Sequence, residues 1–476
     1  MTIPGDPSPD EELREAEREI LTRRPEHTIE PTLDRIAALV SLLGDPQRAY
    51  PVIHVTGTNG KTSTARMIES LLRARGLRTG LFTSPHLSSI RERIVVDGEP
   101  VPAEQFVAGY QELAPYVAMV DGQQPVPLSF FEVLTGMAFA IFADVPVDVA
   151  IVEVGLGGTW DSTNVADGAV AVVTPVSLDH TRWLGETVEQ IAGEKAGIIK
   201  PGAVGVLAQQ PVAAAEVLLR RAVSVGASVL REGIEFGVLE RDLAVGGQRL
   251  DLHGLRGDYT DILLPLFGAY QASNAAVALT AVEAFASGAA LPGQAAGESG
   301  DAAAEPGQLG QEIVRAGFAQ VTSPGRLEVV RRSPLVIVDA AHNPAGMAAA
   351  MAAVTEAFTF AALIGVLAIS EDKDVPGILD QLEPVVSELV VTRNSSDRSM
   401  NPAKLAELAT GVFGPERVHV APRLDEALEM AVTLADEASG EEGLTRTGVL
   451  VTGSVITAGD ARVLLGPLTG TAAGPE

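Results

Sequence analysis

The chain has 476 residues, 46% of them hydrophobic, no cysteine, and a formal charge of −28 at pH 7. This length predicts two or three domains, and the missing cysteine excludes disulfides, thiolate metal sites and cysteine nucleophiles. Such an acidic balance disfavours nucleic acid and anionic membranes as partners, so anionic substrates need a local basic site.

A charged extension is expected at residues 1–30, because residues 10–30 are rich in charged side chains and contain no apolar signal core. No apolar run in the sequence reaches the roughly 18 residues that span a bilayer. We therefore expect a cytoplasmic monomer that acts on small molecules, without nucleic-acid or membrane partners.

Residues 31–322 alternate between short apolar runs and helical patterns, which is typical of a mostly parallel α/β sheet. The segment 227–265 differs, because its short strands and Gly-containing turns predict a small antiparallel patch. A helix is expected over 271–286, and the Ala-, Gly-, Glu- and Pro-rich stretch 287–309 is interpreted as a surface insertion. The strands expected in the main sheet are 52–56, 78–83, 147–154, 169–175 and 203–208.

The same alternation resumes over residues 323–476 and predicts a second, smaller domain. The predicted architecture is therefore α/β throughout, with an N-terminal P-loop NTPase-like domain and a C-terminal Rossmann-like domain. The strands expected in the second domain are 335–338, 362–367, 389–392, 417–420 and 448–452.

The segment 54–64 (HVTGTNGKTST) predicts a phosphate-binding loop, because it lies between an apolar strand and an amphipathic helix. Backbone N–H groups in such a loop and the helix N-terminus favour a phosphate, while Lys61 reaches the terminal phosphates and Thr62 can contact Mg²⁺. The general pattern has Gly where this chain has Val55, so a tight turn with a solvated lysine is the alternative. The residues expected to bind ATP here are Gly57, Thr58, Asn59, Gly60, Lys61, Thr62 and Ser63.

Glu153 ends the apolar run 149–152 and predicts a metal site. Ligands of α/β proteins bind at the carboxyl ends of parallel strands, and a carboxylate beside a phosphate-binding loop commonly holds Mg²⁺ directly or through water. The alternative is a strand-end glutamate that faces solvent. The nearby Gly155-Leu156-Gly157-Gly158 lacks the spacing of a dinucleotide fingerprint, and no metalloprotease or serine-hydrolase motif is present.

Lys195 falls on an apolar helical stripe with Val188, Ile191 and Ile198. The side chain either extends outward to solvent, which the sequence alone favours, or stays desolvated with a lowered pKa. A neutral amine of that kind can capture carbon dioxide as a carbamate that binds Mg²⁺. His180 is open to two readings as well, since a lone histidine is more often structural than a ligand.

In the second domain, Asp339 ends an apolar strand, His342 follows it, and Arg326 lies just upstream. An acid, a histidine and an arginine near one strand end can grip a nucleotide. An ordinary strand and loop with an aspartate cap is the alternative.

Taken in order, these segments resemble the folylpolyglutamate synthase/dihydrofolate synthase family of Mur-ligase-like amide ligases. The resemblance spans roughly residues 30–460. One departure is Thr62-Ser63 after the lysine, where the family more often has Gly first, which leaves open which hydroxyl contacts Mg²⁺. The matching segments are 54–64, 84–87 (SPHL), 130–132 (FFE), 153–164 (EVGLGGTWDSTN), 177–180 (SLDH), 193–200 (GEKAGIIK), 268–274 (GAYQASN), 323–326 (SPGR), 339–344 (DAAHNP) and 452–454 (TGS).

The resemblance implies an ATP-dependent ligase that adds L-glutamate to a pteroate or folate carboxylate through an acyl phosphate. It implies two Mg²⁺ sites, a carbamylated Lys195, and closure of one domain over the other. Alternatives are a Mur-type ligase for another substrate, a non-catalytic nucleotide switch and a hydride-transfer enzyme. By this resemblance the catalytic residues are Lys61, His180 and Lys195, and the metal-associated residues are Thr62, Ser84, Glu153, His180 and Lys195. The further residues that contact ATP are Asn274, Arg326, Asp339 and His342. The residues near the pterin are Phe131 and Asp161.

Overall fold

The computed structural model describes residues 8–26, 28, 30–288, 307–439 and 446–466. Most of the predicted insertion at 287–309 and parts of the N-terminal extension lie outside these residues. The chain divides into two compact units. The first comprises Met1–Pro85, Ile90–Pro265 and Gln271–Val321, and the second comprises His86–Ser89, Leu266–Tyr270 and Thr322–Glu476.

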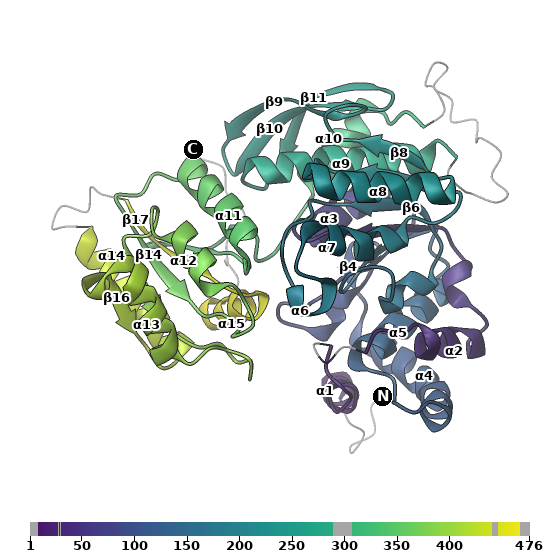
Figure 1. Ribbon diagram of the computed structural model, residues 1–476, viewed down its shortest axis with the longest axis horizontal. Helices are drawn as coiled ribbons and strands as arrows, with labels where there is room; N and C mark the ends of the chain where they lie inside the picture. The colour runs from purple at the N-terminus through teal and green to yellow at the C-terminus, as the bar shows by residue number, and fades with distance from the viewer. Residues whose placement is uncertain (1–7, 27, 29, 289–306, 440–445, 467–476) are drawn as a thin grey trace. The chain divides into compact units, whose positions relative to one another are not determined.

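The first unit is built on an eight-stranded sheet in the order β4-β3-β2-β5-β1-β6-β7-β8 (Figure 1). The six strands from β2 to β8 in that order are parallel, and β3 and β4 add an antiparallel edge. The predicted α/β class is therefore confirmed. The strands are β1 Val52–Thr56, β2 Thr79–Phe82, β3 Ile94–Val96, β4 Glu99–Pro100, β5 Val149–Glu153, β6 Gly168–Val173, β7 Val204–Leu207 and β8 Ser228–Arg231.

The central strands are apolar because their side chains are buried on both faces. All five residues of β1 and of β5 are buried, which is the pattern of a parallel strand covered by helices on each side. The helices of this part of the chain are α1 Pro9–Leu21, α2 Asp34–Leu42, α3 Lys61–Ala74, α4 Ala103–Gln123, α5 Phe130–Asp144, α6 Thr181–Leu184, α7 Val188–Lys195, α8 Val212–Val225, α9 Ala269–Ala286 and α10 Gln311–Ala319.

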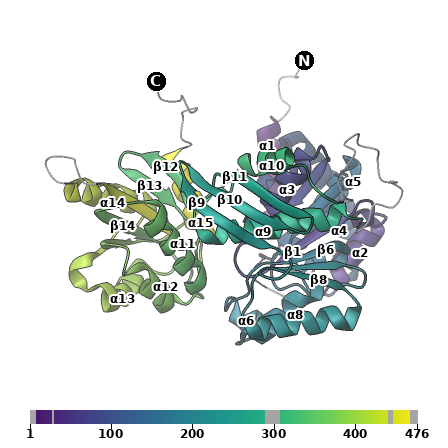
Figure 2. The same ribbon diagram turned by 90° about the horizontal axis from the view of Figure 1, so that it is seen from above.

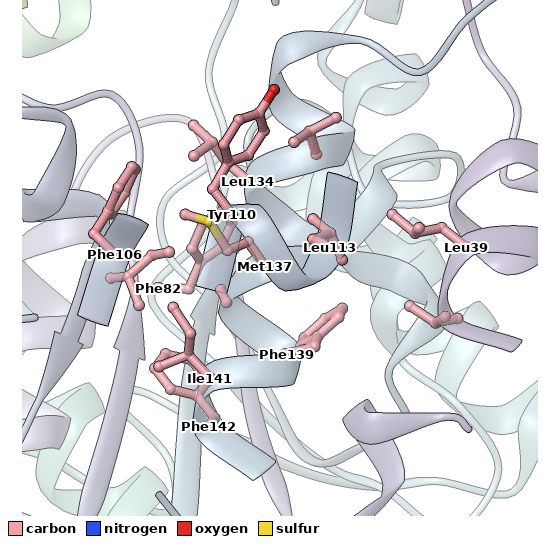
Figure 3. Packing of buried hydrophobic residues seen from close by; sticks show 14 of the residues in the cluster. Leu39, Phe82, Phe106, Tyr110, Leu113, Leu134, Met137, Phe139, Ile141 and Phe142 are labelled. Atoms are coloured by element: carbon pink, nitrogen blue, oxygen red, sulfur yellow. The ribbon is translucent and has the colours of Figure 1, made fainter. Parts of the chain in front are cut away.

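A large apolar cluster fixes α4 and α5 against the sheet (Figure 3). Phe106 of α4 and Phe142 of α5 are fully buried in it, as is Phe82 of β2. The start of α5 is set by a capping box, in which Ser129 accepts from the Glu132 N–H and Glu132 accepts from the Ser129 N–H. Burial of this cluster thus holds the first turn of α5, and with it Phe131, in a fixed place.

The antiparallel patch predicted within segment 227–265 is confirmed, but it begins later in the chain than predicted. β8 pairs in parallel with β7 and forms the edge of the large sheet, so only the later residues form the antiparallel patch. Figure 2 shows this patch beside α9, where the Tyr259 hydroxyl donates to the buried Glu283 at 2.8 Å. The patch consists of β9 Gly237–Ala244, β10 Gly247–Gly254 and β11 Gly257–Leu264, in the order β11-β10-β9.

The second unit has a six-stranded sheet in the order β12-β13-β17-β14-β15-β16. All neighbours are parallel except β12 and β13, and two separate apolar clusters are built from side chains of this unit. In the described part of the chain, no helix combines the length and the apolar character that crossing a membrane requires. The elements are β12 Glu328–Arg332, β13 Leu335–Val338, α11 Pro344–Ala357, β14 Ala362–Leu367, α12 Val375–Leu382, β15 Glu388–Val391, α13 Pro402–Phe413, β16 Val418–Val420, α14 Leu424–Ala438, β17 Thr447–Thr452 and α15 Val455–Leu465.

Candidate active site

The loop between β1 and α3 has the backbone of a phosphate-binding turn. Gly57 and Gly60 both have positive φ, 146° and 90°, a region that glycine adopts at little cost. A Cβ on Gly57 would lie 1.8 Å from the Thr174 hydroxyl oxygen, and one on Gly60 would lie 2.7 Å from Asn274 Oδ1. Both positions therefore require glycine for space as well as for conformation.

Backbone and side-chain hydrogen bonds hold this loop in place. The Thr58 N–H donates to the Pro175 carbonyl at 3.0 Å, and the Thr58 hydroxyl donates to the Ser177 carbonyl at the same distance. The Lys61 ammonium donates to the carbonyls of Gly57 and Thr58, at 3.2 and 3.1 Å. Lys61 thus lies along the loop, whose backbone N–H groups would bind the phosphate.

Glu153 lies at the carboxyl end of β5, beside β1, and is 1% exposed. Its Oε1 accepts a hydrogen bond from the Thr62 hydroxyl at 2.8 Å, and its Oε2 accepts one from the Ser84 N–H at 3.3 Å. The Ser63 hydroxyl instead accepts from Gln271 of α9 at 3.4 Å. The structure therefore brings together three of the predicted metal residues, Thr62, Ser84 and Glu153.

Lys195, the last residue of α7, is 4% exposed and does not extend to solvent. Its Nζ donates to the Gly57 carbonyl at 2.7 Å. Burial, and then the charge of Lys61, lowers the pKa of Lys195 to about 7. An amine with this pKa is substantially neutral at physiological pH and so is nucleophilic. The desolvated alternative, which the sequence did not favour, is the one that the structure shows.

His180 is the N-cap residue of α6 and has a positive φ of 49°. Its N–H donates to Oδ1 of the neighbouring Asp179 at 2.8 Å, and its side chain is 37% exposed. Asp179 is buried, and its charge acts to raise the pKa of Lys195 against the larger effect of burial. Sequence reasoning missed Asp179; its place in the SLDH segment, directly before His180, was the available signal.

The loop that follows β5 carries Asp161 and lies against Phe131. A Cβ on Gly155 would lie 2.5 Å from the Phe131 ring and 3.2 Å from Asp161 Oδ2, so Gly155 passes between the two predicted pterin residues. The Leu156 N–H donates to Asp161 Oδ2 at 2.8 Å. Burial raises the pKa of Asp161, and the donors from Thr163, Leu156 and Gly155 oppose that rise.

Asn274 of α9 is buried and donates to the Gln271 side chain at 3.1 Å. Because its Oδ1 approaches Gly60, the first turns of α9 lie against the phosphate-binding loop. This contact places the predicted ATP residue Asn274 at the glycine that precedes Lys61.

The remaining predicted ATP residues belong to the second unit and meet at the end of β13. Asp339 accepts the N–H groups of Leu327 and Ala341, at 3.0 and 2.8 Å. Burial raises the pKa of Asp339, and the charge of Arg326 opposes this rise. His342 Nδ1 lies 2.9 Å from the Ala340 carbonyl oxygen. Asp339 therefore joins the Arg326 loop to the loop that carries His342.

The donors around Glu153 suit Mg²⁺, which prefers carboxylate and hydroxyl oxygens and retains several waters and phosphate oxygens. Within the described ranges, no group of three or more His, Asp or Glu side chains could hold a metal by itself. A single buried carboxylate with hydroxyl neighbours fits an ion that arrives with a nucleotide.

Comparison with known proteins decides the family. The model of the Mur ligase glutamate ligase domain matches residues 325–455. The chain is 50% identical to a dihydrofolate synthase/folylpolyglutamate synthase from Mycobacterium tuberculosis, over 97% of this chain and 96% of that protein. The chain belongs to the dihydrofolate synthase/folylpolyglutamate synthase family. The resemblance found in the sequence is thereby confirmed.

Other members of the family agree in sequence and in fold. The folylpolyglutamate synthase of Lacticaseibacillus casei is 36% identical over 74% of this chain and 79% of that protein. The Mycobacterium tuberculosis folylpolyglutamate synthase solved with ADP superposes with a TM-score of 0.89 at 49% identity, covering 96% of this chain and 99% of that one. The α/β architecture is therefore that of the dihydrofolate synthase/folylpolyglutamate synthase family.

Proposed function

We propose that this chain is an ATP-dependent ligase that joins L-glutamate to the carboxylate of a pteroate or a folate, with ADP and phosphate as co-products. The observation that carries the proposal is that a phosphate-binding loop, the buried Glu153 and the buried Lys195 meet at the carboxyl ends of the central strands β1 and β5. It occurs in a chain that is half identical to a dihydrofolate synthase/folylpolyglutamate synthase. Both reactions, addition to dihydropteroate and extension of a reduced folate, are included.

The reaction begins with activation of the substrate carboxylate. One carboxylate oxygen attacks the γ-phosphorus of ATP, and the bond between this phosphorus and the oxygen that bridges to the β-phosphate breaks. The step forms an acyl phosphate and releases ADP. The neutral amino group of glutamate then attacks the acyl carbon, inorganic phosphate departs, and the nitrogen loses a proton. Positioning and charge neutralisation supply most of the rate in such a transfer.

Cationic side chains of this chain serve that neutralisation. Lys61 is held along the phosphate-binding loop by two carbonyls, where it neutralises the terminal phosphates. Arg326, positioned through Asp339, neutralises nucleotide charge from the second unit, and His342 and Asn274 contact the nucleotide. An acyl phosphate hydrolyses in water, so closure of the domain at 323–476 over the domain at 31–322 excludes solvent.

Two Mg²⁺ ions complete the proposed site. Thr62, Ser84 and Glu153 hold one, and His180 and a carbamylated Lys195 hold the second. When bound, the ions neutralise phosphate charge and orient the triphosphate. Carbamylation joins the neutral Lys195 amine to carbon dioxide and releases one proton. The buried position and lowered pKa of the lysine support this modification.

The pterin ring is proposed to lie against Phe131 and Asp161. Phe131 is half-buried and packs against Phe82, with ring centroids 5.7 Å apart, so it offers an aromatic surface of fixed orientation. The protein is proposed to act in the cytoplasm as a monomer on small molecules, without nucleic-acid or membrane partners. The net charge of −28 supports the absence of anionic polymers among its partners.

A phosphate-release assay tests the proposal. ATP, glutamate and either dihydropteroate or a tetrahydrofolate should together yield phosphate and a product heavier by one glutamyl residue. A Mur-type ligase would instead require a nucleotide-linked precursor, and a nucleotide switch would bind ATP without release when substrates are added. Family membership does not favour the Mur-type alternative. Absence of turnover with both pteridine substrates would refute the proposal.

A further inference from the structure

A chain of buried hydrogen bonds connects the phosphate-binding strand to the loop that follows β5. His54, in the middle of β1, is fully buried, and its Nε2 lies 2.9 Å from the Thr163 hydroxyl oxygen. The Thr163 hydroxyl in turn donates to Asp161 Oδ1.

The direction of the hydrogen bonds follows from the donors available. A threonine hydroxyl has one hydrogen, and here it goes to the Asp161 carboxylate. His54 must therefore donate through Nε2–H, which leaves Nδ1 as an acceptor. That buried atom has no hydrogen-bond partner among the residues that the structure describes. Burial, reinforced by the charge of Lys200, lowers the pKa of His54 to about 3, so the ring is neutral.

Asp161 connects these hydrogen bonds to the backbone of the loop that follows β5. Its Oδ1 also accepts the Thr163 N–H at 3.0 Å, and its Oδ2 accepts the Leu156 N–H at 2.8 Å. Leu156 follows Gly155, the residue that lies between Asp161 and the Phe131 ring. The orientation of the carboxylate therefore sets the path of the backbone along the aromatic surface.

Lys200 fixes the other end of the same loop. Its ammonium donates to the carbonyls of Asn164 and Ala166, both at 2.7 Å, which are the carbonyls left open as the short helix Ser162–Val165 ends. Lys200 thus holds the loop at Asn164 and Ala166, and the hydrogen-bond chain from His54 holds it at Asp161.

We propose that His54 and Thr163 are positioning residues for the pteridine-bearing substrate, because they orient Asp161 and through it the Gly155-Leu156 backbone beside Phe131. This inference rests on the proposed function. Neither residue is among those proposed to contact ATP or the reacting atoms. Their effect is on how well the substrate ring binds and not on the nucleotide.

Substitution at Thr163 separates positioning from general stability. Thr163→Val keeps the shape and removes the hydroxyl, and with it the two buried hydrogen bonds that join His54 to Asp161. The KM for dihydropteroate should therefore rise about tenfold or more. The KM for ATP should change by less than about twofold, and Thr163→Ser should restore both values. Thr280→Val is the matched control, since the buried Thr280 hydroxyl lies on α9 and has no hydrogen-bond partner in the described part of the chain.

Equal changes in both KM values would overturn the inference, as would a Thr163→Ser variant that behaves like Thr163→Val. If the unmodified protein turns over neither pteridine substrate, the proposed function fails. If the unmodified protein is active and Thr163→Val matches it, only the positioning role fails.

A spectroscopic measurement reads the tautomer of His54 in the unmodified protein, and a variant serves only to assign the signal. The chain has seven histidines, and selective ¹⁵N-histidine labelling resolves them, with the signal of His54 assigned by its loss in His54→Gln. The Nε2–H tautomer should persist from pH 8 down to pH 5. A Nδ1–H tautomer, or a protonated ring at pH 6, would contradict the hydrogen-bond direction on which the inference depends.

Discussion

The Lys195 ammonium nitrogen lies 2.7 Å from the carbonyl oxygen of Gly57, although 138 positions separate the two residues in the sequence. One residue ends α7 and the other begins the phosphate-binding loop. The contact connects the GEKAGIIK segment to the proposed nucleotide site, and the lysine that makes it is buried. It makes Lys195 the residue on which the proposed second metal site depends.

Lys195→Ala should lower ligase turnover by roughly 10²- to 10³-fold, the size expected when a group that stabilises transition-state charge is lost. Lys195→Arg should be equally inactive, because the guanidinium stays protonated and cannot be carbamylated at neutral pH. Short carboxylic acids should partly restore Lys195→Ala by supplying the missing anion. Steady-state phosphate release measures each effect.

Lys404→Ala provides the control for these lysine variants, since Lys404 is 57% exposed and belongs to the second unit. It should retain the turnover of the unmodified protein. Full activity of Lys195→Ala, or of Lys195→Arg, would remove the role assigned to the carbamate.

Glu153→Gln should raise the Mg²⁺ concentration for half-maximal turnover by roughly 10- to 100-fold. The amide keeps the size of the side chain and its acceptor oxygen for Thr62, but it loses the negative charge that attracts the ion. A Mg²⁺ titration of the rate at saturating ATP measures this shift. The exposed Glu216→Gln is the control, and an unchanged Mg²⁺ requirement in Glu153→Gln would show that Glu153 has no part in metal binding.

Asp161→Ala should impair dihydropteroate binding more than ATP binding. Loss of the carboxylate leaves the Leu156 and Thr163 N–H groups without their acceptor, so the loop beside Phe131 loses its fixed path. We expect a rise of about tenfold or more in KM for dihydropteroate. Initial-rate kinetics with each substrate varied in turn test this prediction, and an equal loss for both substrates would place Asp161 outside the pterin site.

Acid should destabilise the folded protein partly through His54. The pKa of His54 is about 3 in the folded state and near 6.5 when unfolded. Between these values only the unfolded chain binds the proton, so the free energy of unfolding falls as pH drops from 6.5 toward 3, by up to about 1.4 kcal/mol per pH unit. His54→Gln should remove this part of the slope, whatever its stability at pH 7.

Denaturant unfolding at pH 7, 6 and 5 measures that slope. His253→Gln is the matched control, because His253 is 48% exposed and its removal should leave the slope close to that of the unmodified protein. Parallel pH profiles for His54→Gln and the unmodified protein would show that His54 titrates normally.

The sequence was sufficient for the sheets because buried parallel strands are continuous apolar runs. The strands at 52–56, 335–338 and 362–367 begin and end where the periodicity predicts. β8 was assigned to the antiparallel patch because Ser228–Arg231 is a half-exposed edge strand, and only its partner β7 shows which sheet it joins. Edge strands β3 and β4 were missed because they have three and two residues.

Site residues at the ends of strands were predictable from the sequence. Residues whose position depends on a contact between distant segments were less predictable. Glu153 follows directly from its place after an apolar run. Whether Lys195 reaches solvent depends on which residues cover the end of α7, and no local sequence pattern shows this. The role of Thr163 was equally hidden, since a threonine in a polar loop gives no sign that a buried histidine 109 positions away donates to it.

The central claim is that the γ-phosphoryl group passes to the substrate carboxylate before the amide forms. Dihydropteroate labelled with ¹⁸O in its carboxylate tests it most directly, with the isotope content of the released phosphate measured by ³¹P NMR. The account predicts one ¹⁸O atom in each phosphate, because the carboxylate oxygen that attacks phosphorus leaves with it. Phosphate that contains no ¹⁸O, released during amide formation, would contradict the account.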